Sequence, residues 1–352
     1  MPSTSAFWGI LALLILNSVH LVASTQLTKR STNLNSRSTL PLTVNTIYEG
    51  EVSTWYENLA VRSNGQLLVT RLDSSLLELL DPTSSSPPVL VHNFTSIYAG
   101  CLGITETSKD VFYVVAQAPF DGNFVKTSGS SSIFKVDLTA SGDNVTANAL
   151  VTKVTDIPEA DFLNGMTTLN AAAGLVLVAD SYNGWVYRLD VNTGNYSVVI
   201  DDPKMKYLPG SLTNLGINGI KIRDGYLYWT NTGSPDFSRI QINSLGEPLG
   251  NSTVVATVHN ADDFVFAEDG VAWVAQNQIE SLSVVENGTT TLVAGNPNST
   301  VLAGVTAGEF GRVGGTEKIL YFTTNGGLAV PVNGSVIVGG KIAYIDTSTF
   351  DE

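Results

Sequence analysis

The stretch that decides the fold is Glu57–Thr70, which reads ENLAVRSNGQLLVT. It contains a polar first residue, a short apolar strand, a turn at Asn64-Gly65 and a second apolar strand. Asn-Gly between two such runs is typical of a β-hairpin, because glycine adopts positive φ without a steric penalty. The stretch therefore predicts two neighbouring strands of an antiparallel sheet.

The same phrase recurs along the chain at intervals of about 40 to 60 residues, close to the length of a four-stranded propeller blade. Its copies begin at or near Glu57, Cys101, Asn164, Asn218, Asp262 and Gly304. After each second strand come a third strand, a turn and an outer strand. The sequence thus predicts an all-β fold, a six-bladed β-propeller with four-stranded antiparallel blades over residues 41–352.

Two segments outside the repeated phrase complete the predicted propeller. We expect Leu42–Tyr48 to pair beside Lys341–Asp346 in the last blade, because the ends of a ring of blades must be joined. The longest interval between copies contains Ala118–Ser132, a Gly/Ser-rich stretch with Phe120 and Phe124. This stretch predicts a long loop over one face of the propeller.

The N-terminus is typical of a secreted protein. An uncharged apolar run from Phe7 to Leu16 precedes Val22-Ala23-Ser24, a small-residue pattern that signal peptidase cleaves. Residues 1–24 therefore predict a signal peptide, and no stretch predicts a membrane span. Residues 25–40 contain Lys29-Arg30 and predict either a short propeptide or a flexible linker. We expect the protein in the secretory pathway, secreted or in a vesicular lumen.

Sequons and the cysteine content agree with that compartment. In a secreted protein, Asn-x-Ser/Thr sites become surface glycans. The predicted glycosylation sites are Asn93, Asn144, Asn195, Asn251, Asn287, Asn298 and Asn333. The single cysteine, Cys101, excludes an intramolecular disulfide, and we expect it to be buried and inert.

Composition narrows the function classes. The formal charge is −14, from 32 acidic and 18 basic residues, which argues against nucleic acid and anionic membranes as partners. After removal of the signal peptide, the remaining histidines are His92 and His259, too few for a histidine metal site. There is no Gly-x-Ser-x-Gly elbow and no phosphate-binding loop. We expect no cofactor, with Ca²⁺ as an alternative discussed below.

The first residues of the six copies are the candidate functional residues. The inner strand of a propeller blade begins at the central channel, so these residues converge on one mouth. They are Glu57, Tyr98–Cys101, Asn164, Asn218, Asp262 and Gly304. The structural alternative for each Asn-Gly pair is a turn in which Gly takes positive φ. A carboxylate at the start of an apolar strand, as at Glu57, needs a partner.

The repeated phrases resemble the senescence-marker-protein (regucalcin)/gluconolactonase propellers and the related NHL-repeat propellers. The resemblance rests on Asn218-Gly followed by Leu-Tyr-Trp-Thr-Asn and on Asp269-Gly-x-x-Trp-Val-Ala. It implies a divalent metal, usually calcium, on Glu57, Asn218 and Asp262, with Asn164 as a further substrate-binding residue. A metal-bound water would then open a lactone. Asp262-Asp263 departs from the Asp-Gly of the family.

The opening phrase Glu57–Thr70 resembles more closely a fungal, secretory-pathway branch that includes hetero-Diels-Alderases of tropolone-sesquiterpene biosynthesis. This resemblance implies a reaction that joins a tropolone-derived quinone methide to a sesquiterpene alkene such as humulene. Apolar residues flank the polar ones, namely Tyr98, Leu163, Met166, Ile217, Phe264 and Phe266. They favour small apolar or aromatic substrates over a sugar lactone.

A cycloaddition needs two reactants held face to face and a hydrogen-bond donor on the heterodiene oxygen. We assign Asn164 and Asn218 as amide donors, and Glu57 or Asp262 as the acid/base that removes water to generate the diene. The substrate-binding candidates are Trp55, Tyr98 and Phe264. The rival functions are a calcium-dependent lactonase and a non-catalytic binding propeller.

Aromatic residues of the second strands are expected to pack the blades together, because aromatic side chains suit half-buried pleated faces. These residues are Tyr113, Tyr228, Trp229, Trp273 and Tyr321.

Overall fold

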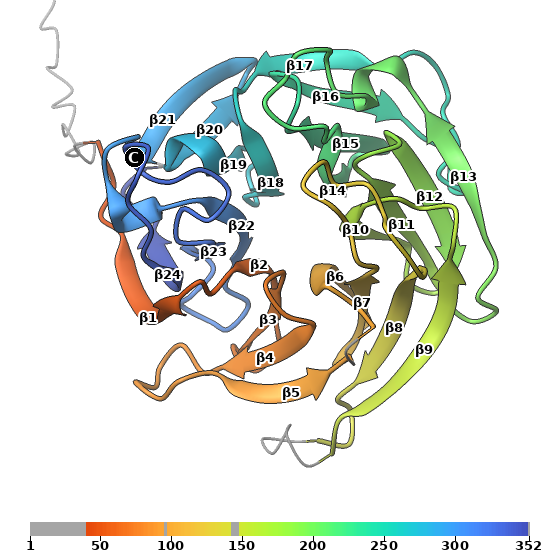
Figure 1. The fold of residues 1–352 in the computed structure, drawn as a ribbon, viewed down its shortest axis with the longest axis horizontal. Helices are drawn as coiled ribbons and strands as arrows, with labels where there is room; N and C mark the ends of the chain where they lie inside the picture. Colours follow the sequence, from red (N-terminus) through yellow and green to blue (C-terminus); the bar gives the residue numbers. More distant parts are fainter. Residues whose placement is uncertain (1–39, 95–96, 142–147, 351–352) are drawn as a thin grey trace, which may run out of the picture. The chain divides into compact units, whose positions relative to one another are not determined.

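The structure, a computed structural model, describes residues 40–94, 97–141 and 148–350. Within these residues the strands form six four-stranded antiparallel sheets, arranged as blades around a central axis (Figure 1). The predicted six-bladed propeller is confirmed. The predictions of a signal peptide, of processing at Lys29-Arg30 and of a glycan on Asn144 lie outside the described residues.

The first three blades follow the chain from the inner strand outward. Blade 1 contains β2 (Tyr56–Val61), β3 (Leu67–Arg71), β4 (Leu76–Leu80) and β5 (Val89–Asn93). Blade 2 contains β6 (Gly100–Ser108), β7 (Val111–Gln117), β8 (Ser131–Asp137) and β9 (Leu150–Ile157). Blade 3 contains β10 (Leu163–Asn170), β11 (Leu175–Asp180), β12 (Trp185–Asp190) and β13 (Tyr196–Asp201).

The last three blades include one strand from the beginning of the chain. Blade 4 contains β14 (Ile217–Arg223), β15 (Tyr226–Asn231), β16 (Asp236–Gln241) and β17 (Thr253–Thr257). Blade 5 contains β18 (Ala261–Phe266), β19 (Ala272–Gln276), β20 (Ser281–Glu286) and β21 (Thr289–Gly295). Blade 6 contains β22 (Val305–Phe310), β23 (Ile319–Thr324), β24 (Gly339–Asp346) and β1 (Asn45–Val52).

The pairing of β1 with β24 closes the ring. Asn45 lies opposite Tyr344 and Glu49 lies opposite Lys341 in an antiparallel ladder. Before the strand, the Leu42 N–H donates to the Val293 carbonyl at 2.7 Å. The predicted closure is confirmed, although the paired strand begins three residues later than Leu42 and extends to Val52.

Apolar clusters fill the spaces between neighbouring blades, so each blade buries both of its faces. Leu177 and Val186 of blade 3, for example, pack in one cluster with Ile220 and Trp229 of blade 4. The aromatic residues predicted to pack blades all lie in these clusters, namely Tyr113, Tyr228, Trp229, Trp273 and Tyr321. Cys101 is fully buried, as predicted, and burial raises the pKa of its thiol.

Helical structure in the described residues is limited to three 3₁₀ segments, η1 (Pro203–Met205), η2 (Asn277–Ile279) and η3 (Thr300–Leu302). The run Ile279-Glu-Ser-Leu-Ser-Val in the sequence predicts that the third strand of blade 5 begins at Ile279. That strand begins instead at Ser281, because Glu280 adopts a left-handed conformation with φ 51° that ends η2. Over the same described residues, no helix has the length and apolar character to cross a membrane.

Candidate active site

Each inner strand contains a β-bulge at the end that faces the central channel. In β2, Tyr56 pairs with Arg71 and Leu59 pairs with Val69, so Glu57 and Asn58 together stand opposite Thr70. The equivalent pairs are Leu102-Gly103, Asn164-Gly165, Asn218-Gly219, Asp262-Asp263 and Thr306-Ala307. A bulge re-aims side chains that a regular ladder would turn into the sheet faces. The sixfold bulge therefore brings polar side chains to one mouth.

The glycines of these bulges are required by the close approach of neighbouring inner strands. A Cβ on Gly165 would lie 2.4 Å from the Asn218 carbonyl oxygen, and one on Gly219 would lie 2.0 Å from Asp263 Oδ1. Neither glycine has positive φ. Asn164-Gly165 and Asn218-Gly219 are thus bulges within strands, and the alternative interpretation of these two pairs as turns is wrong.

A network of hydrogen bonds lies at the floor of the mouth. Asn218 Nδ2 donates to Asp262 Oδ1 at 2.7 Å and to Thr232 Oγ1 at 2.8 Å. Asn277 Nδ2 donates to Asp262 Oδ2 at 2.7 Å. The Trp55 indole N–H donates to Glu57 Oε2. The two buried carboxyl groups therefore each have a fixed donor.

Asp263, the departure from the family pattern, lies in the same layer. Its Oδ2 accepts a hydrogen bond from Asn58 Nδ2 at 2.9 Å, and Lys221 Nζ lies 3.8 Å from the same oxygen. The contact joins blade 1 to blade 5 across the axis. Besides burial, the charge of Asp263 raises the pKa of Glu57 and of Asp262, and Lys221 offsets part of that charge.

The pKa values of the two carboxyl groups reflect this setting. Burial raises the pKa of Glu57 well above its ordinary value, and the charge of Asp262 raises it further. Burial raises the pKa of Asp262 to about 7, against the opposing effect of the hydrogen bond from Asn277. The pair can therefore keep protons at a pH at which ordinary carboxyl groups are ionised.

Asn164 differs from the other polar side chains of the mouth. It is 3% exposed and lines the cavity, yet its amide has no hydrogen-bond partner among the described residues. The amide is not among the fully buried polar atoms that lack a partner, so it faces the open space of the cavity. Asn164 is therefore the side chain most ready to bind a ligand.

Aromatic side chains form one wall of the cavity. The loop between β7 and β8 contains Phe120 and Phe124, whose rings stack 5.8 Å apart. Both rings meet Phe162 edge-on, at 4.9 and 5.2 Å. Lys126 Nζ holds the loop by donating to the Ala160 carbonyl at 2.9 Å. The predicted loop therefore lies at the mouth, where Phe124 and Phe162 line the cavity.

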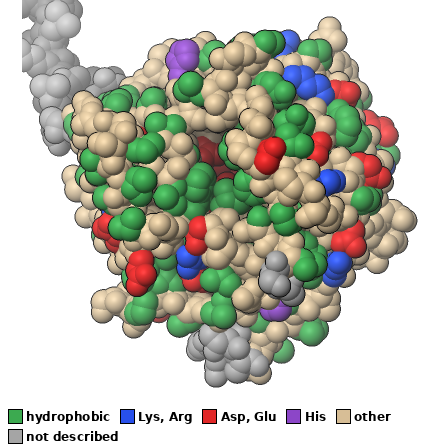
Figure 2. Space-filling model, viewed as in Figure 1, with side chains coloured by type: hydrophobic (Ala, Val, Ile, Leu, Met, Phe, Trp, Pro, Cys, Tyr) green, Lys and Arg blue, Asp and Glu red, His purple; other side chains and the backbone are tan. Residues whose placement is uncertain are grey.

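The cavity is narrow in this conformation, with a volume of about 50 Å³. Apolar residues contribute much of its lining, including Trp55, Leu72, Phe124, Phe162 and Leu215. The face viewed in Figure 2 is hollowed at its centre, with acidic side chains at the bottom and hydrophobic side chains beside the hollow. The site combines apolar walls with an acidic floor.

The structure brings together most of the predicted site residues. Trp55, Glu57, Asn164, Asn218 and Asp262 line the cavity.

Two predicted substrate-binding residues, Tyr98 and Phe264, lie elsewhere. Tyr98 is buried between blades 1 and 2 and hydrogen-bonds Ser132 Oγ at 2.9 Å. Phe264 follows the bulge of β18, so its side chain turns into the cluster between blades 4 and 5 and packs on Phe237. Neither residue lines the cavity.

The remaining candidates were misplaced by one or two positions. Leu102 and Thr306, rather than Cys101 and Gly304, are equivalent to Glu57, because the bulges begin there. Leu102 is apolar, and Thr306 Oγ1 donates to the Tyr56 carbonyl at 2.9 Å. Blades 2 and 6 therefore contribute no polar bulge side chain to the cavity lining.

Sequence reasoning missed the residues that follow the second strands. Thr232 comes just after β15 and Asn277 just after β19, and both line the cavity. In an antiparallel pair, the end of the second strand lies beside the start of the first. Polar residues after the phrases Tyr-Trp-Thr-Asn and Trp-Val-Ala-Gln were the signal that could have revealed them.

In this arrangement, hydrogen bonds within the site engage the side chains of the alternative calcium set. Calcium takes six to eight oxygen ligands. Here Asn218 presents its Nδ2 to Asp262, and N–H donors from Asn277 and Trp55 occupy the carboxyl oxygens.

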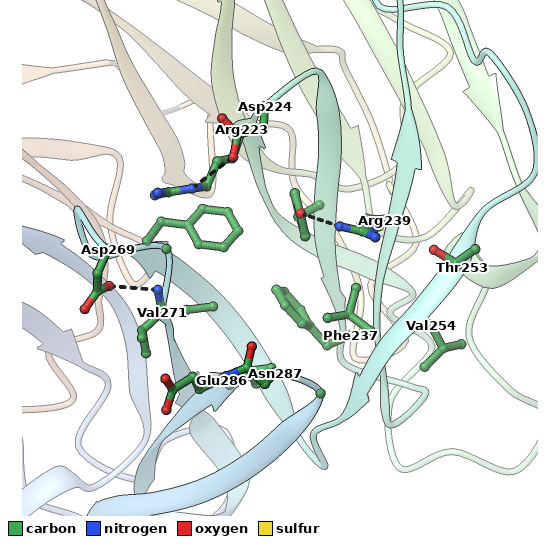
Figure 3. Close-up of a pocket in the computed structure, with 17 residues that line it drawn as sticks. Arg223, Asp224, Phe237, Arg239, Thr253, Val254, Asp269, Val271, Glu286 and Asn287 are labelled. Carbon is green, nitrogen blue, oxygen red and sulfur yellow. Dashed lines mark hydrogen bonds and ion pairs between the residues drawn. The ribbon is translucent and has the colours of Figure 1, made fainter. Parts of the chain in front are cut away.

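A larger cleft, with a volume of about 630 Å³, lies between blades 4 and 5 (Figure 3). Its charged groups already have neighbours. Arg239 donates to Tyr228 Oη at 3.0 Å and lies over the Tyr226 ring, and Arg223 lies 3.5 Å from Asp224. The cleft contains none of the buried carboxyl groups of the mouth. We therefore take the central cavity as the candidate active site.

Comparisons with known proteins agree with the fold and with the sequence resemblance. The chain is 28% identical over 312 residues to a Phoma sp. protein named "Putative hetero-Diels-Alderase", covering 82% of this chain and 88% of the relative. It is 26% identical over 357 residues to a Sarocladium schorii protein with the same description, covering 92% of this chain and 88% of the relative. No protein-family model matches the chain.

Solved structures of low sequence identity share the architecture. Regucalcin from Agrobacterium tumefaciens, described as a calcium-binding protein, has a TM-score of 0.56 at 14% identity over 87% of this chain and 94% of its own. A gluconolactonase from Xanthomonas campestris has a TM-score of 0.55 at 13% identity over 86% of this chain and 89% of its own. The chain is thus a six-bladed propeller whose fold is similar to those of a regucalcin and a gluconolactonase, and its sequence is similar to those of proteins named as hetero-Diels-Alderases.

Proposed function

We propose that the protein catalyses a hetero-Diels-Alder cycloaddition between a tropolone-derived quinone methide and a sesquiterpene alkene such as humulene. The observation that carries the proposal is a cavity with aromatic walls above two buried carboxyl groups and the unpartnered amide of Asn164. The two relatives named as hetero-Diels-Alderases support the reaction class.

The cycloaddition forms one C–C bond and one C–O bond, and no electrons leave the two reactants. The protein's main task is to hold the reactants face to face. In the best intramolecular models such positioning lowers the barrier by about 7 to 11 kcal/mol. Trp55, Phe124 and Phe162 offer flat apolar surfaces for this purpose.

The carboxyl pair supports formation of the heterodiene. A protonated Glu57 or Asp262 donates its proton to the hydroxyl group that leaves the precursor as water. The carboxylate then takes the proton of the ring hydroxyl group, which yields the quinone methide and restores the acid. The raised pKa values of both groups suit this exchange near neutral pH.

The substrates require a wider cavity than the one described. Ligand pockets commonly enclose about 300 to 1,000 Å³. The Phe124 loop covers one side of the cavity, and Phe124 has φ 63°, a conformation that bulky residues rarely adopt. We infer that this loop moves outward when the reactants bind.

The test combines the purified protein, a quinone-methide precursor and humulene, with and without a chelator. We expect a cycloadduct whose formation the chelator does not change. Replacing Asn164 by alanine should lower kcat/KM about tenfold. Removal of an oxyanion-hole donor from an acyl-transfer enzyme lowers kcat by roughly 10²- to 10³-fold. The effect here is smaller because the heterodiene oxygen gains less charge in the transition state. Asn192→Ala, at an exposed turn, is the matched control.

Two outcomes would contradict the proposal. A folded Asn164→Ala protein with full activity would contradict the assignment of the central cavity as the active site. Chelator-sensitive lactone hydrolysis without cycloadduct would favour the second candidate, a calcium-dependent lactonase, which the gluconolactonase-like fold supports.

We also propose that the protein is secreted and N-glycosylated. The support is the exposure of the six sequon asparagines in the described residues, namely Asn93, Asn195, Asn251, Asn287, Asn298 and Asn333. Mass spectrometry of the secreted protein before and after glycosidase treatment tests this. An unchanged mass would contradict it.

A further inference from the structure

A second polar side chain at the cavity has no partner. Thr213 lies in the segment between η1 and β14 and lines the cavity together with Leu215. Its Oγ1 is buried and has no hydrogen-bond partner among the described residues. The backbone there is fixed, because Ser211 Oγ donates to the Thr213 carbonyl at 2.6 Å.

The other polar side chains of the cavity are already engaged. Besides the floor network of Glu57, Asn218, Asp262 and Asn277, Gln278 Oε1 accepts a hydrogen bond from Asn260 Nδ2 at 2.7 Å. Thr232 Oγ1 donates to the Ala261 carbonyl at 3.1 Å. Within the described part of the chain, Asn164 and Thr213 are therefore the two polar lining side chains that make no side-chain hydrogen bond.

Their chemistry matches an oxygenated ring. A threonine hydroxyl can donate and accept a hydrogen bond, and an asparagine amide can do the same through its two ends. A tropolone ring presents a carbonyl oxygen beside a hydroxyl group, which requires both a donor and an acceptor. The sesquiterpene has no comparable group and would contact only the apolar walls.

We propose that Thr213 and Asn164 form the subsite that binds the oxygen-bearing edge of the heterodiene ring. The inference rests on the proposed function and adds a residue, Thr213, that selects for an oxygenated ring and orients it. The hydroxyl group of Thr213 hydrogen-bonds the ring oxygen, while Asn164 binds the neighbouring one. The hydrocarbon partner then occupies the side lined by the aromatic residues.

The test measures binding of two probes, tropolone and the oxygen-free hydrocarbon azulene, by calorimetry. Thr213→Val removes the hydroxyl group and keeps the shape of the side chain. We expect the Kd for tropolone to rise about fivefold, the loss that corresponds to one neutral hydrogen bond. The Kd for azulene should stay unchanged, and Thr213→Ser should restore most of the affinity for tropolone.

A matched control separates the subsite from a general effect of losing a hydroxyl group. Ser238 Oγ on β16 is also buried without a partner, but Ser238 does not line the cavity. Ser238→Ala should therefore bind tropolone as the wild type does. If Thr213→Val does not fold, Thr213→Ala gives the same comparison.

The outcomes distinguish the two proposals. If the wild type binds both probes and Thr213→Val binds tropolone equally well, the subsite is overturned and the cycloaddition proposal stands. If Thr213→Val loses tropolone selectively but no cycloadduct forms, the subsite stands and the function is overturned. A wild type that binds neither probe overturns both.

Discussion

Replacing Asp262 by asparagine should change how stability depends on pH. The folded protein holds the Asp262 proton up to about pH 7, whereas an ordinary aspartate releases its proton near pH 3.8. Between these values the folded state binds more protons than the unfolded chain, so raising the pH destabilises the wild type. The contribution is fully present below pH 3.8 and is lost as the pH rises through about 7.

The magnitude follows from the pKa difference. The rise from 3.8 to about 7 corresponds to about 4 kcal/mol at roughly 1.4 kcal/mol per unit. The free energy of unfolding of the wild type, minus that of Asp262→Asn, should therefore fall by about 4 kcal/mol between pH 4 and pH 8. Loss of the Asp262 charge also removes one cause of the raised pKa of Glu57, which acts in the same direction.

The assay is equilibrium unfolding in urea at several pH values between 3 and 8. Asp190→Asn is a control of opposite sign, because hydrogen bonds from the Asn192 backbone and from Thr193 lower the pKa of that exposed carboxyl group. The wild type should lose stability relative to Asp190→Asn only as the pH falls below 3.8. A wild-type-minus-Asp262→Asn difference that stays constant from pH 4 to pH 8 would refute the reasoning.

Two further predictions concern the architecture. Gly165→Ala should lower the free energy of unfolding by about 1 to 3 kcal/mol, because the new Cβ would overlap the Asn218 carbonyl. Thermal unfolding measures this loss. Gly250→Ala is the control, because the new Cβ there meets open space. Deletion of residues 40–48 should abolish soluble expression, because β1 then loses its pairing with β24. Deletion of residues 25–39, the control, should leave soluble expression unchanged. A well-folded protein that lacks residues 40–48 would contradict the closure of the ring by β1.

The fold could be predicted from the sequence because each blade repeats one hairpin phrase. Asn64-Gly65 forms the expected turn, with φ 90° at Gly65, and Asn164 and Asn218 are the second residues of the inner strands β10 and β14. Local turn chemistry and strand pattern agree with the global fold at these positions. Strand ends were less predictable, since Leu42 precedes the paired strand and Ile279 belongs to η2.

The site was only partly predictable. Glu57 was visible because a carboxyl group at the start of an apolar strand is unusual, and Asp262 was visible because it begins a copy of the repeated phrase. The bulge that aims them at the axis has no signal in one strand alone, so Tyr98 and Phe264 were assigned to a cavity that they do not line. Thr213 lies in a non-repeating segment, where the sequence has no periodicity that relates one residue to another.

The position of β1 in blade 6 has a consequence for synthesis of the chain. β1 ends at Val52, but its partner strand β24 begins at Gly339. At the usual elongation rate of about 5 to 20 residues per second, the ribosome needs roughly 15 to 60 seconds to make the intervening segment. Throughout that interval the first strand has no ladder to join, and the apolar face of blade 1 that packs on blade 6 has no partner. The ring can therefore close, and the first strand can take its place in a sheet, only after the last strand has been made.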